Sequence, residues 1–423
     1  MTKNILNKIK CILHHTVYGL RSTVYESDSF TLVELLIVVG IIAILSAAVI
    51  VLLNPTELLE RGRDSQRISD LKSIQTVIER YKYTGNRISS LGNPNTVYVS
   101  LVDAIKSNCA DLNLPPLASG WFYHCVDSTS TMQKIDGTGW IPVNISALGL
   151  LSSFPIDPIN NPASNLYYSY IVNSSGQFEL TATLESQKKL KDTALVDGGT
   201  DPAKYETGDT VALWTQASGL IAYWPYDEGS GAVANDATGD GYNATLYNGV
   251  TWAPGKISGS AGFPSSAYAD VPGFTNSFPA LFSVSLWAKN LNTNIWNFLL
   301  SREIWNSSSG WLLGSEGGGW GFYKAGGSLQ VVSPNNIWAD NGWHYVSAVY
   351  NGVNMYLYAD GNFIGSSTVA LTSPSISLIM GARHSNDGTS YTDTGFDGNL
   401  DDVRIYSRAL SATEIQNMYT ATK

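Results

Sequence analysis

Residues 30–53 read FTLVELLIVVGIIAILSAAVIVLL, and this stretch decides how the rest of the chain is organised. From Leu35 to Leu53 it carries no charged residue. A helix rises about 1.5 Å per residue, so the run is long enough to cross a hydrocarbon core of roughly 30 Å. It is longer than the apolar core of a signal peptide, and no small-residue cleavage site follows it. One acid, Glu34, lies just inside its N-terminal end.

Glu34 is the feature that a plain membrane anchor does not explain. A carboxylate near the membrane interior costs roughly 2.5 kcal/mol or more, so we expect it to have a partner. The sequence FTLVEL from Phe30 to Leu35, followed by a long apolar helix, resembles the N-terminus of type IV pilins and of type II secretion pseudopilins. In that family a prepilin peptidase cuts before the Phe and methylates the new amine. The fifth mature residue then pairs with the amine of a neighbouring subunit.

The resemblance gives roles to three residues. It implies processing and methylation at Ser29 and Phe30, and it makes Phe30 and Glu34 the residues of assembly. A buried amine and a buried carboxylate are tolerated only together, so such a pair fixes the register between subunits. The family usually has Gly before the cut, where this chain has Ser29. A plain membrane anchor is the alternative interpretation.

The leader and the following helix predict where the chain resides. Residues 1–29 form a mildly basic leader, which the positive-inside rule places on the cytoplasmic side. We therefore expect a single-pass precursor in the cytoplasmic or inner membrane, with residues 30–54 as the transmembrane and assembly helix. After processing, the resemblance implies a filament at the cell surface, with other pilin subunits as partners.

Residues 55–185 predict a pilin-like globular domain. Ile68, Leu71, Ile74, Ile78 and Tyr81 recur at three- and four-residue steps, which indicates one apolar helix face. Alternating runs at 97–99, 121–124, 167–172 and 177–184 predict strands. The expected fold is α+β, with a long N-terminal helix spine and a small antiparallel sheet. Residues 186–218 are rich in Gly and Lys and are expected to form a linker.

Composition limits the function and the redox chemistry. The formal net charge is −10 and only 14% of residues are charged, which disfavours nucleic acid as a partner. Of the three cysteines, Cys11 lies in the leader. Cys109 and Cys125 remain in the part expected outside the membrane, so we predict a disulfide between them. Two free buried thiols are the alternative.

From residue 219 to 423 the composition indicates an all-β domain. Nine of the twelve Trp residues are here, and short alternating runs are separated by turns. The runs at 343–350 and 355–359 are each followed by a hairpin signal, first Asn351-Gly352 and then Asp360-Gly361. About 200 residues of such strands indicate a β-sandwich or jelly roll.

Several motifs in this region match one family in order. They are GLIAYWPYDEGSG at 219–231, DATGDGYNA at 236–244, the strand from Gly342, and DGNLDDVRIYSRALS at 397–411. These motifs resemble a laminin-G-like jelly roll of the concanavalin A type. A closing helix is expected after Ser411, because Glu414 three residues later completes a capping box.

That fold hosts both binding modules and glycosidases, so residues must decide between them. A retaining glycosidase needs two carboxylates about 5–5.5 Å apart, usually from a Glu-x-Asp-x-x-Glu strand on this fold. No such run occurs after residue 219, and we predict that the protein is not an enzyme. Two pairs of acids suit a structural calcium ion: Asp236 and Asp240 in a Gly-rich turn, and Asp401 and Asp402 before an expected strand. The alternative is that these acids cap turns.

Two loops offer candidate ligand contacts. Trp305 is flanked by polar residues, and Trp296 is the second aromatic of this kind. The loop from 383 to 397 adds Asp387 and Tyr391. Sugars stack on exposed aromatic rings, although most Trp residues here alternate within strands and are expected in the core.

These patterns together predict a type IV pilin-like filament subunit that displays a lectin-like jelly roll. The expected ligand is a glycan or a surface protein. The alternatives are a pseudopilin of a type II secretion or DNA-uptake machine, and a pilin-anchored glycan hydrolase.

Overall fold

A computed structural model describes ten segments of the chain, and they are 31–84, 90–105, 107–275, 278–290, 297–316, 319–326, 330–332, 340–388, 390–391 and 395–423. Side chains at 47–53, 290, 316 and 330 are outside this description. The leader with Ser29, as well as Phe30 and Trp296, lies outside the described residues. The chain divides into two compact units, Met1–Thr56 and Glu57–Lys423.

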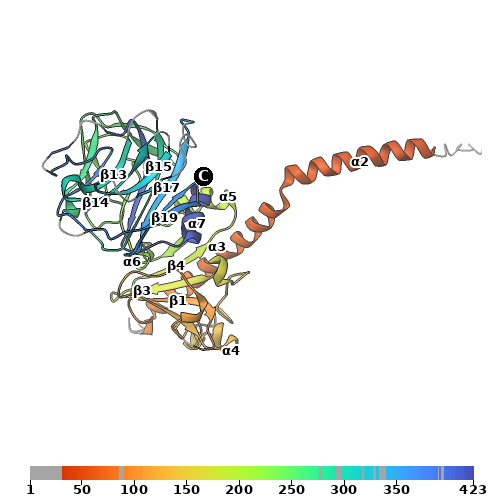
Figure 1. Cartoon of the computed structure of the whole chain (residues 1–423). Helices are drawn as coiled ribbons and strands as arrows, with labels where there is room; N and C mark the ends of the chain where they lie inside the picture. The colour runs from red at the N-terminus through yellow and green to blue at the C-terminus, as the bar shows by residue number, and fades with distance from the viewer. Residues whose placement is uncertain are drawn as a thin grey trace, which may run out of the picture. The chain divides into compact units, whose positions relative to one another are not determined.

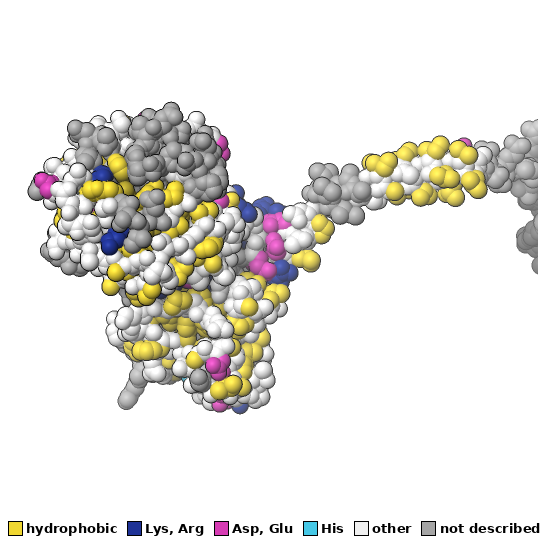
Figure 2. All heavy atoms as spheres, in the orientation of Figure 1, with side chains coloured by type: hydrophobic (Ala, Val, Ile, Leu, Met, Phe, Trp, Pro, Cys, Tyr) yellow, Lys and Arg dark blue, Asp and Glu magenta, His cyan; other side chains and the backbone are white. Residues whose placement is uncertain are grey.

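The first unit contains the helix α2 (Leu32–Leu53). Thr31 caps it: the Thr31 side chain accepts a hydrogen bond from the Glu34 amide, and the Glu34 carboxylate accepts one from the Thr31 amide at 2.9 Å. This capping box satisfies amides that a helix start leaves unpaired. Figure 2 shows hydrophobic side chains along the described part of this helix, and they are exposed in the single chain. No helix among the described residues has both the length and the apolar character needed to cross a membrane.

Asn54 separates α2 from the next helix, α3 (Pro55–Tyr83). Its backbone is left-handed, with a φ of 40°, and Pro55 then occupies the first helical position. The apolar stripe of α3 is buried at Leu71, Ile74 and Ile78. The stripe packs on the first sheet in one hydrophobic cluster that also holds Tyr170 and Leu180.

The first sheet has the strand order β2-β1-β3-β4-β5. Its strands are β1 (Thr96–Val102), β2 (Phe122–Val126), β3 (Tyr168–Val172), β4 (Phe178–Thr183) and β5 (Lys204–Gly208). The expected antiparallel sheet is wrong in one pair, because β1 and β2 are parallel. A parallel pair needs a long crossover, and residues 103–121 supply it.

The segment 186–218 differs from the expected linker. It contains α5 (Gln187–Asp192) and α6 (Leu213–Ser218), and between them β5 pairs with β4. The reason is that Ala203 and Tyr205 are buried against the α3 cluster, so two apolar side chains suffice to add an edge strand. Gly219, with a φ of 77°, ends α6 and begins the C-terminal domain.

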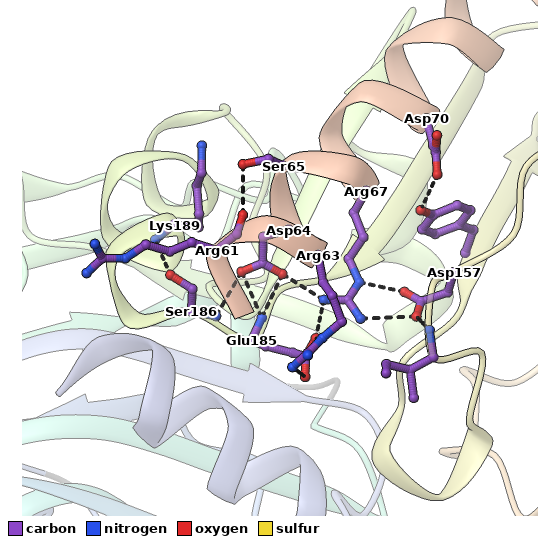
Figure 3. Close-up of polar contacts among 12 residues, drawn as sticks. Arg61, Arg63, Asp64, Ser65, Arg67, Asp70, Asp157, Glu185, Ser186 and Lys189 are labelled. Carbon is purple, nitrogen blue, oxygen red and sulfur yellow. Dashed lines mark hydrogen bonds and ion pairs between the residues drawn. The ribbon is translucent and has the colours of Figure 1, made fainter. Parts of the chain in front are cut away.

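A buried ionic network fastens α3 to this sheet (Figure 3). Arg67 is fully buried and binds Asp157 through two hydrogen bonds, from Nε to Oδ2 at 2.6 Å and from Nη2 to Oδ1 at 3.0 Å. Its Nη1 donates to Asp64 Oδ1 at 2.7 Å and to Glu185 Oε2 at 2.6 Å. Burial alone would lower the pKa of Arg67, but these carboxylates raise it. Three separate segments therefore meet at one guanidinium.

The C-terminal domain is a sandwich of two eight-stranded sheets (Figure 1). In the first, the order is β19-β18-β17-β12-β21-β10-β9, and β6 pairs with β21. Its strands are β6 (Leu220–Trp224), β9 (Thr251–Pro254), β10 (Gly259–Phe263), β12 (Phe282–Asn290), β17 (Trp343–Tyr350), β18 (Asn354–Ala359), β19 (Asn362–Thr368) and β21 (Gly398–Tyr406). We call this the first sandwich sheet.

The second sandwich sheet has the order β16-β15-β14-β13-β20-β11-β8-β7. Its strands are β7 (Val233–Ala234), β8 (Ala244–Tyr247), β11 (Tyr268–Val271), β13 (Asn297–Ile304), β14 (Ser309–Glu316), β15 (Gly319–Lys324), β16 (Gln330–Val332) and β20 (Leu378–Met380). The remaining short helices are α4 (Thr129–Met132), η2 (Ala110–Leu112), η3 (Ser146–Leu148), η4 (Pro162–Ser164), η5 (Ala194–Val196), η6 (Pro272–Phe274) and η7 (Trp305–Ser307).

Two local predictions in this domain are confirmed. β17, β18 and β19 form the expected meander, with turns at Asn351-Gly352 and Asp360-Gly361. The closing helix α7 (Ala412–Thr422) begins at Ser411 with the expected capping box to Glu414. Alternate residues of both sheets fill a common core that includes Val284, Leu300 and Phe322.

Candidate functional site

The two loops predicted to contact a ligand, around Trp305 and after Arg383, lie side by side at one end of β13. The Asn306 amide in η7 donates to the Asn386 carbonyl oxygen at 2.8 Å. The Arg383 guanidinium lies 4.7 Å from the centre of the Trp305 ring and 5.7 Å from that of Phe298. Trp305 is half-buried, because Arg383 occupies part of its surface. We call this the Trp305–Arg383 surface.

A buried carboxylate lies beneath this surface. Glu303 is fully buried, and Arg383 Nε is 2.9 Å from its Oε1 atom. Burial raises the pKa of Glu303 to about 7, although Arg383 acts in the opposite direction. Sequence reasoning missed this pair. Consecutive strand residues point to opposite faces, so alternation could have placed Glu303 on the face opposite Arg302, but it does not report the contact with Arg383.

Asp387 and Tyr391 lie further along the loop that begins at Arg383, and their side chains have different surroundings. Asp387 is exposed and accepts a hydrogen bond from Ser385 Oγ at 2.6 Å. The Tyr391 ring packs on Tyr268 at 4.4 Å, and its hydroxyl donates to Asp270 at 3.1 Å. Tyr268 in turn stacks on Tyr247 at 4.9 Å. This row of three tyrosines was missed, although Tyr268 and Asp270 stand two apart on one strand and therefore share a face.

Asp236 and Asp240, proposed as calcium ligands, lie in one turn. The Asp236 carboxylate accepts hydrogen bonds from the amides of Tyr223, Thr238 and Tyr242, at 3.0, 3.0 and 3.1 Å. Amide donors aimed at both oxygens organise a turn, whereas a cation needs those lone pairs free. Burial, together with the charge of Asp236, raises the pKa of Asp240.

Asp401 and Asp402 have other partners. Asp401 Oδ2 accepts from the amides of Lys256 and Ile257 at 2.7 and 2.9 Å. Burial and the neighbouring charge of Asp402 raise the pKa of Asp401 to about 8. Asp402 accepts from the Tyr223 hydroxyl at 2.7 Å and forms an ion pair with Arg404. Over the parts of the chain that the structure describes, no three acids, histidines or cysteines are grouped to hold a metal, so calcium binding stays a prediction.

Cys109 and Cys125 form the predicted disulfide, which confirms that expectation. It joins the crossover 103–121 to β2, and both residues are buried in the cluster on the second face of the first sheet. Glu34 is exposed on α2, with its carboxylate in the capping box. Its role in assembly stays a prediction, as does processing at Ser29 and Phe30.

The fold and the family comparison define the class of the C-terminal domain. Residues 263–416 match a laminin-G family model described as the concanavalin A-like lectin/glucanases superfamily. The domain is therefore a laminin-G-like jelly roll of the concanavalin A type, as the sequence motifs predicted. No curated protein matches the chain.

Three of the solved structures that are similar to this chain are two toxin binding domains and one enzyme domain in complex with arabinotriose. The binding domain of Paraclostridial Mosquitocidal Protein 1 has 17% identity and a TM-score of 0.39, over 47% of this chain and 51% of that one. Domain 4 of AbnA, an arabinanase from Geobacillus stearothermophilus, has 18% identity and a TM-score of 0.37, over 47% and 97%. A botulinum neurotoxin serotype D/C binding domain has 16% identity and a TM-score of 0.38, over 48% and 52%. The match thus spans about half the length of the toxin domains.

Proposed function

We propose that this chain is a type IV pilin-like subunit that displays its jelly roll to bind a glycan or a surface protein. The observation that carries the proposal is the combination in one chain of the FTLVEL motif, the apolar helix α2 and a concanavalin A-like domain. α2 exposes Leu32, Leu36 and Ile44 by more than half of their surface, and such a surface needs a membrane or other subunits to cover it.

The assembly role rests on Glu34. In the precursor a prepilin peptidase would cut before Phe30, and the new amine would take a position next to the Glu34 carboxylate of a neighbouring subunit. The precursor would reside in the membrane and the processed subunit at the cell surface. Both hydrogen bonds that Thr31 donates to Glu34 in the capping box go to the Oε2 atom, and we propose Oε1 as the acceptor for that amine.

The assembly role is tested by N-terminal sequencing and by Glu34→Ala. The mature protein is expected to begin at a methylated Phe30, and an intact Met1 would refute this. Glu34→Ala is expected to accumulate in the membrane without forming filaments, whereas Glu57→Ala on α3 serves as an acid-removing control with filaments intact. Secretion defects without filaments would favour a pseudopilin instead.

The binding role rests on the Trp305–Arg383 surface. It combines an aromatic ring, a cation and the exposed Asp387 on two adjacent loops, and loops on a rigid scaffold carry most binding sites. A ring face beside polar groups suits a sugar, whose CH face stacks while its hydroxyls form hydrogen bonds. A retaining glycosidase needs two available carboxylates, and Glu303 is fully buried and paired with Arg383, so we propose binding without catalysis.

A glycan array with the full chain tests the binding role. Trp305→Ala is expected to lower the signal at least about tenfold, because ring stacking and hydrogen bonds are lost together. Phe363→Ala is the matched control, since this exposed ring lies on β19 of the other sandwich sheet. Equal loss in both variants would contradict the assignment. Release of reducing sugar from a bound glycan would instead indicate a hydrolase.

The proposed structural calcium ion is tested by the melting temperature of the protein with and without calcium, which should be higher with the ion.

A further inference from the structure

A cavity opens at one end of the sandwich, where residues of both sheets line it. Its volume is about 390 Å³, and its walls are mostly apolar. The aromatic and aliphatic walls include Phe278, Phe282, Trp311, Tyr350 and Leu371. The Trp311 ring stacks on Phe282 at 4.9 Å and lies 5.7 Å from Phe278. A volume of this size lies within the range of small-ligand sites, roughly 300–1,000 Å³.

Arg302 lies behind Ser373, one of the residues that line this cavity. It is opposite Trp311 in the register of β13 and β14, and its guanidinium is 5.1 Å from the centre of the Phe278 ring. Its Nη1 atom donates to Ser373 Oγ at 2.5 Å, and Ser373 lines the cavity. Only 2% of Arg302 is exposed. Its neighbour Glu303 points to the other face of the sheet, so this cavity is distinct from the Trp305–Arg383 surface.

The charge of Arg302 is uncompensated within the described part of the chain. Its remaining acceptors are the backbone oxygens of Phe274 and Thr275, at 3.1 and 3.3 Å, and both are neutral. Its Nε atom has no hydrogen-bond partner, and neither does Nε1 of Trp311. Burial, with no carboxylate to offset it, lowers the pKa of Arg302 to about 10. Buried charges are normally paired and buried donors are normally satisfied, so the site lacks an anionic acceptor.

We propose that this cavity binds a monosaccharide unit that carries a carboxylate, such as a terminal hexuronate. The carboxylate pairs with Arg302 after Ser373 yields its place, and the sugar ring packs on the aromatic walls. A neutral sugar leaves the guanidinium unpaired, so the site discriminates by charge. This inference rests on the proposed glycan-binding function and gives it a ligand class.

The test measures binding of two oligosaccharides to the full chain in detergent by isothermal titration calorimetry. One ends in glucuronate and the other, otherwise identical, ends in glucose. The wild type is expected to bind the glucuronate form at least about tenfold more tightly, as a charge-assisted hydrogen bond predicts. Arg302→Met is expected to remove this difference. Its melting temperature is expected to stay or rise, because an uncompensated buried charge is replaced by an apolar chain of similar length.

Leu371→Trp is a second variant that leaves Arg302 in place. It fills the cavity beside Tyr350 and is expected to abolish glucuronate binding, with Phe363→Ala as the unaffected control. Unchanged discrimination in Arg302→Met, or equal binding of the two probes by the wild type, overturns the inference. Binding of benzoate without glucuronate also overturns it. If Trp305→Ala loses glycan binding while Arg302→Met and Leu371→Trp keep it, the cavity is not the site, but the proposed glycan-binding function is supported. If the wild type binds neither a glycan nor a surface protein, the proposed function and this inference are both refuted.

Discussion

Replacing Arg67 by Met tests the physical link between α3 and the rest of its unit. Arg67 makes four contacts with three carboxylates, all at 3.0 Å or less. Removing one partner of a buried ion pair costs about 3–5 kcal/mol, because the other charges stay buried. Asp157 keeps the amides of Ile159 and Asn160, and Asp64 keeps that of Ser186. We therefore expect a loss near the lower end, about 3 kcal/mol.

The loss is expected to depend on pH. Burial already raises the pKa of Asp64 with Arg67 present, and removal of the guanidinium raises it further. A carboxyl whose folded pKa is raised binds its proton more tightly in the folded state. The variant is therefore most stable at low pH and loses stability as the pH rises through that pKa. The gap to the wild type should be largest near pH 8 and smallest near pH 4.

The assay is urea denaturation followed by hydrogen-exchange mass spectrometry of α3 peptides, at three pH values. Arg61→Met is the matched control, since Arg61 forms a part-exposed pair with Glu57 on the same helix and should cost less than about 1 kcal/mol. If the two variants lose equal stability at pH 7, or if the loss in Arg67→Met is independent of pH, the network does not fasten α3.

Three further predictions concern other parts of the chain. The Cys109–Cys125 disulfide joins residues 16 positions apart, and its reduction should lower the free energy of unfolding by about 3 kcal/mol in the chain-entropy model. The measurement is the melting temperature, which should fall in reductant and fall equally in Cys125→Ser. Burial acts against the charge of His344, but its two Asp neighbours raise its pKa. The charged ring therefore contributes its full stabilisation of the fold at pH 5.5, and this contribution is lost at pH 8.5. At pH 8.5 His344→Gln should have the melting temperature of the wild type. Burial raises the pKa of Glu179 to about 7, so the stability of the fold decreases as the pH rises from about 4.5 to 7. Glu179→Gln removes this charge and should raise the melting temperature more at pH 8 than at pH 5.

Local patterns predicted much of the fold. The α3 stripe, the two hairpin turns and the closing helix each follow from neighbouring residues, and hydrophobic spacing or capping chemistry reports them directly. The parallel pairing of β1 with β2 could not be predicted, because strand order depends on how a long crossover returns. β5 was taken for a linker because Tyr205 is its one large apolar residue, while its buried Lys204 and Glu206 are polar.

The site was predicted in outline and not in its chemistry. Polar residues around Trp305 correctly indicated a half-exposed ring, yet Arg383 is 78 positions away in the sequence and nothing local reports their contact. The uncompensated charge of Arg302 is visible only when its acceptors are known to be neutral. Sequence identifies residue types suited to binding, whereas pairing and burial decide which of them remain available.

The distribution of buried rings indicates which side of the sandwich is free to bind. On the outer face of the first sandwich sheet, Trp287 and Tyr345 pack under Met418 of α7, and Trp287 Nε1 donates to Thr422 at 3.0 Å. The part of that face under α7 buries its aromatic side chains against the helix, whereas Phe363 on β19 stays exposed. On the second sandwich sheet, Trp305 and the tyrosine row keep part of their surface outside the core. A ligand that needs an aromatic contact is therefore expected away from the part of the first sandwich sheet that α7 covers, and a substitution on α7 should alter stability before it alters binding.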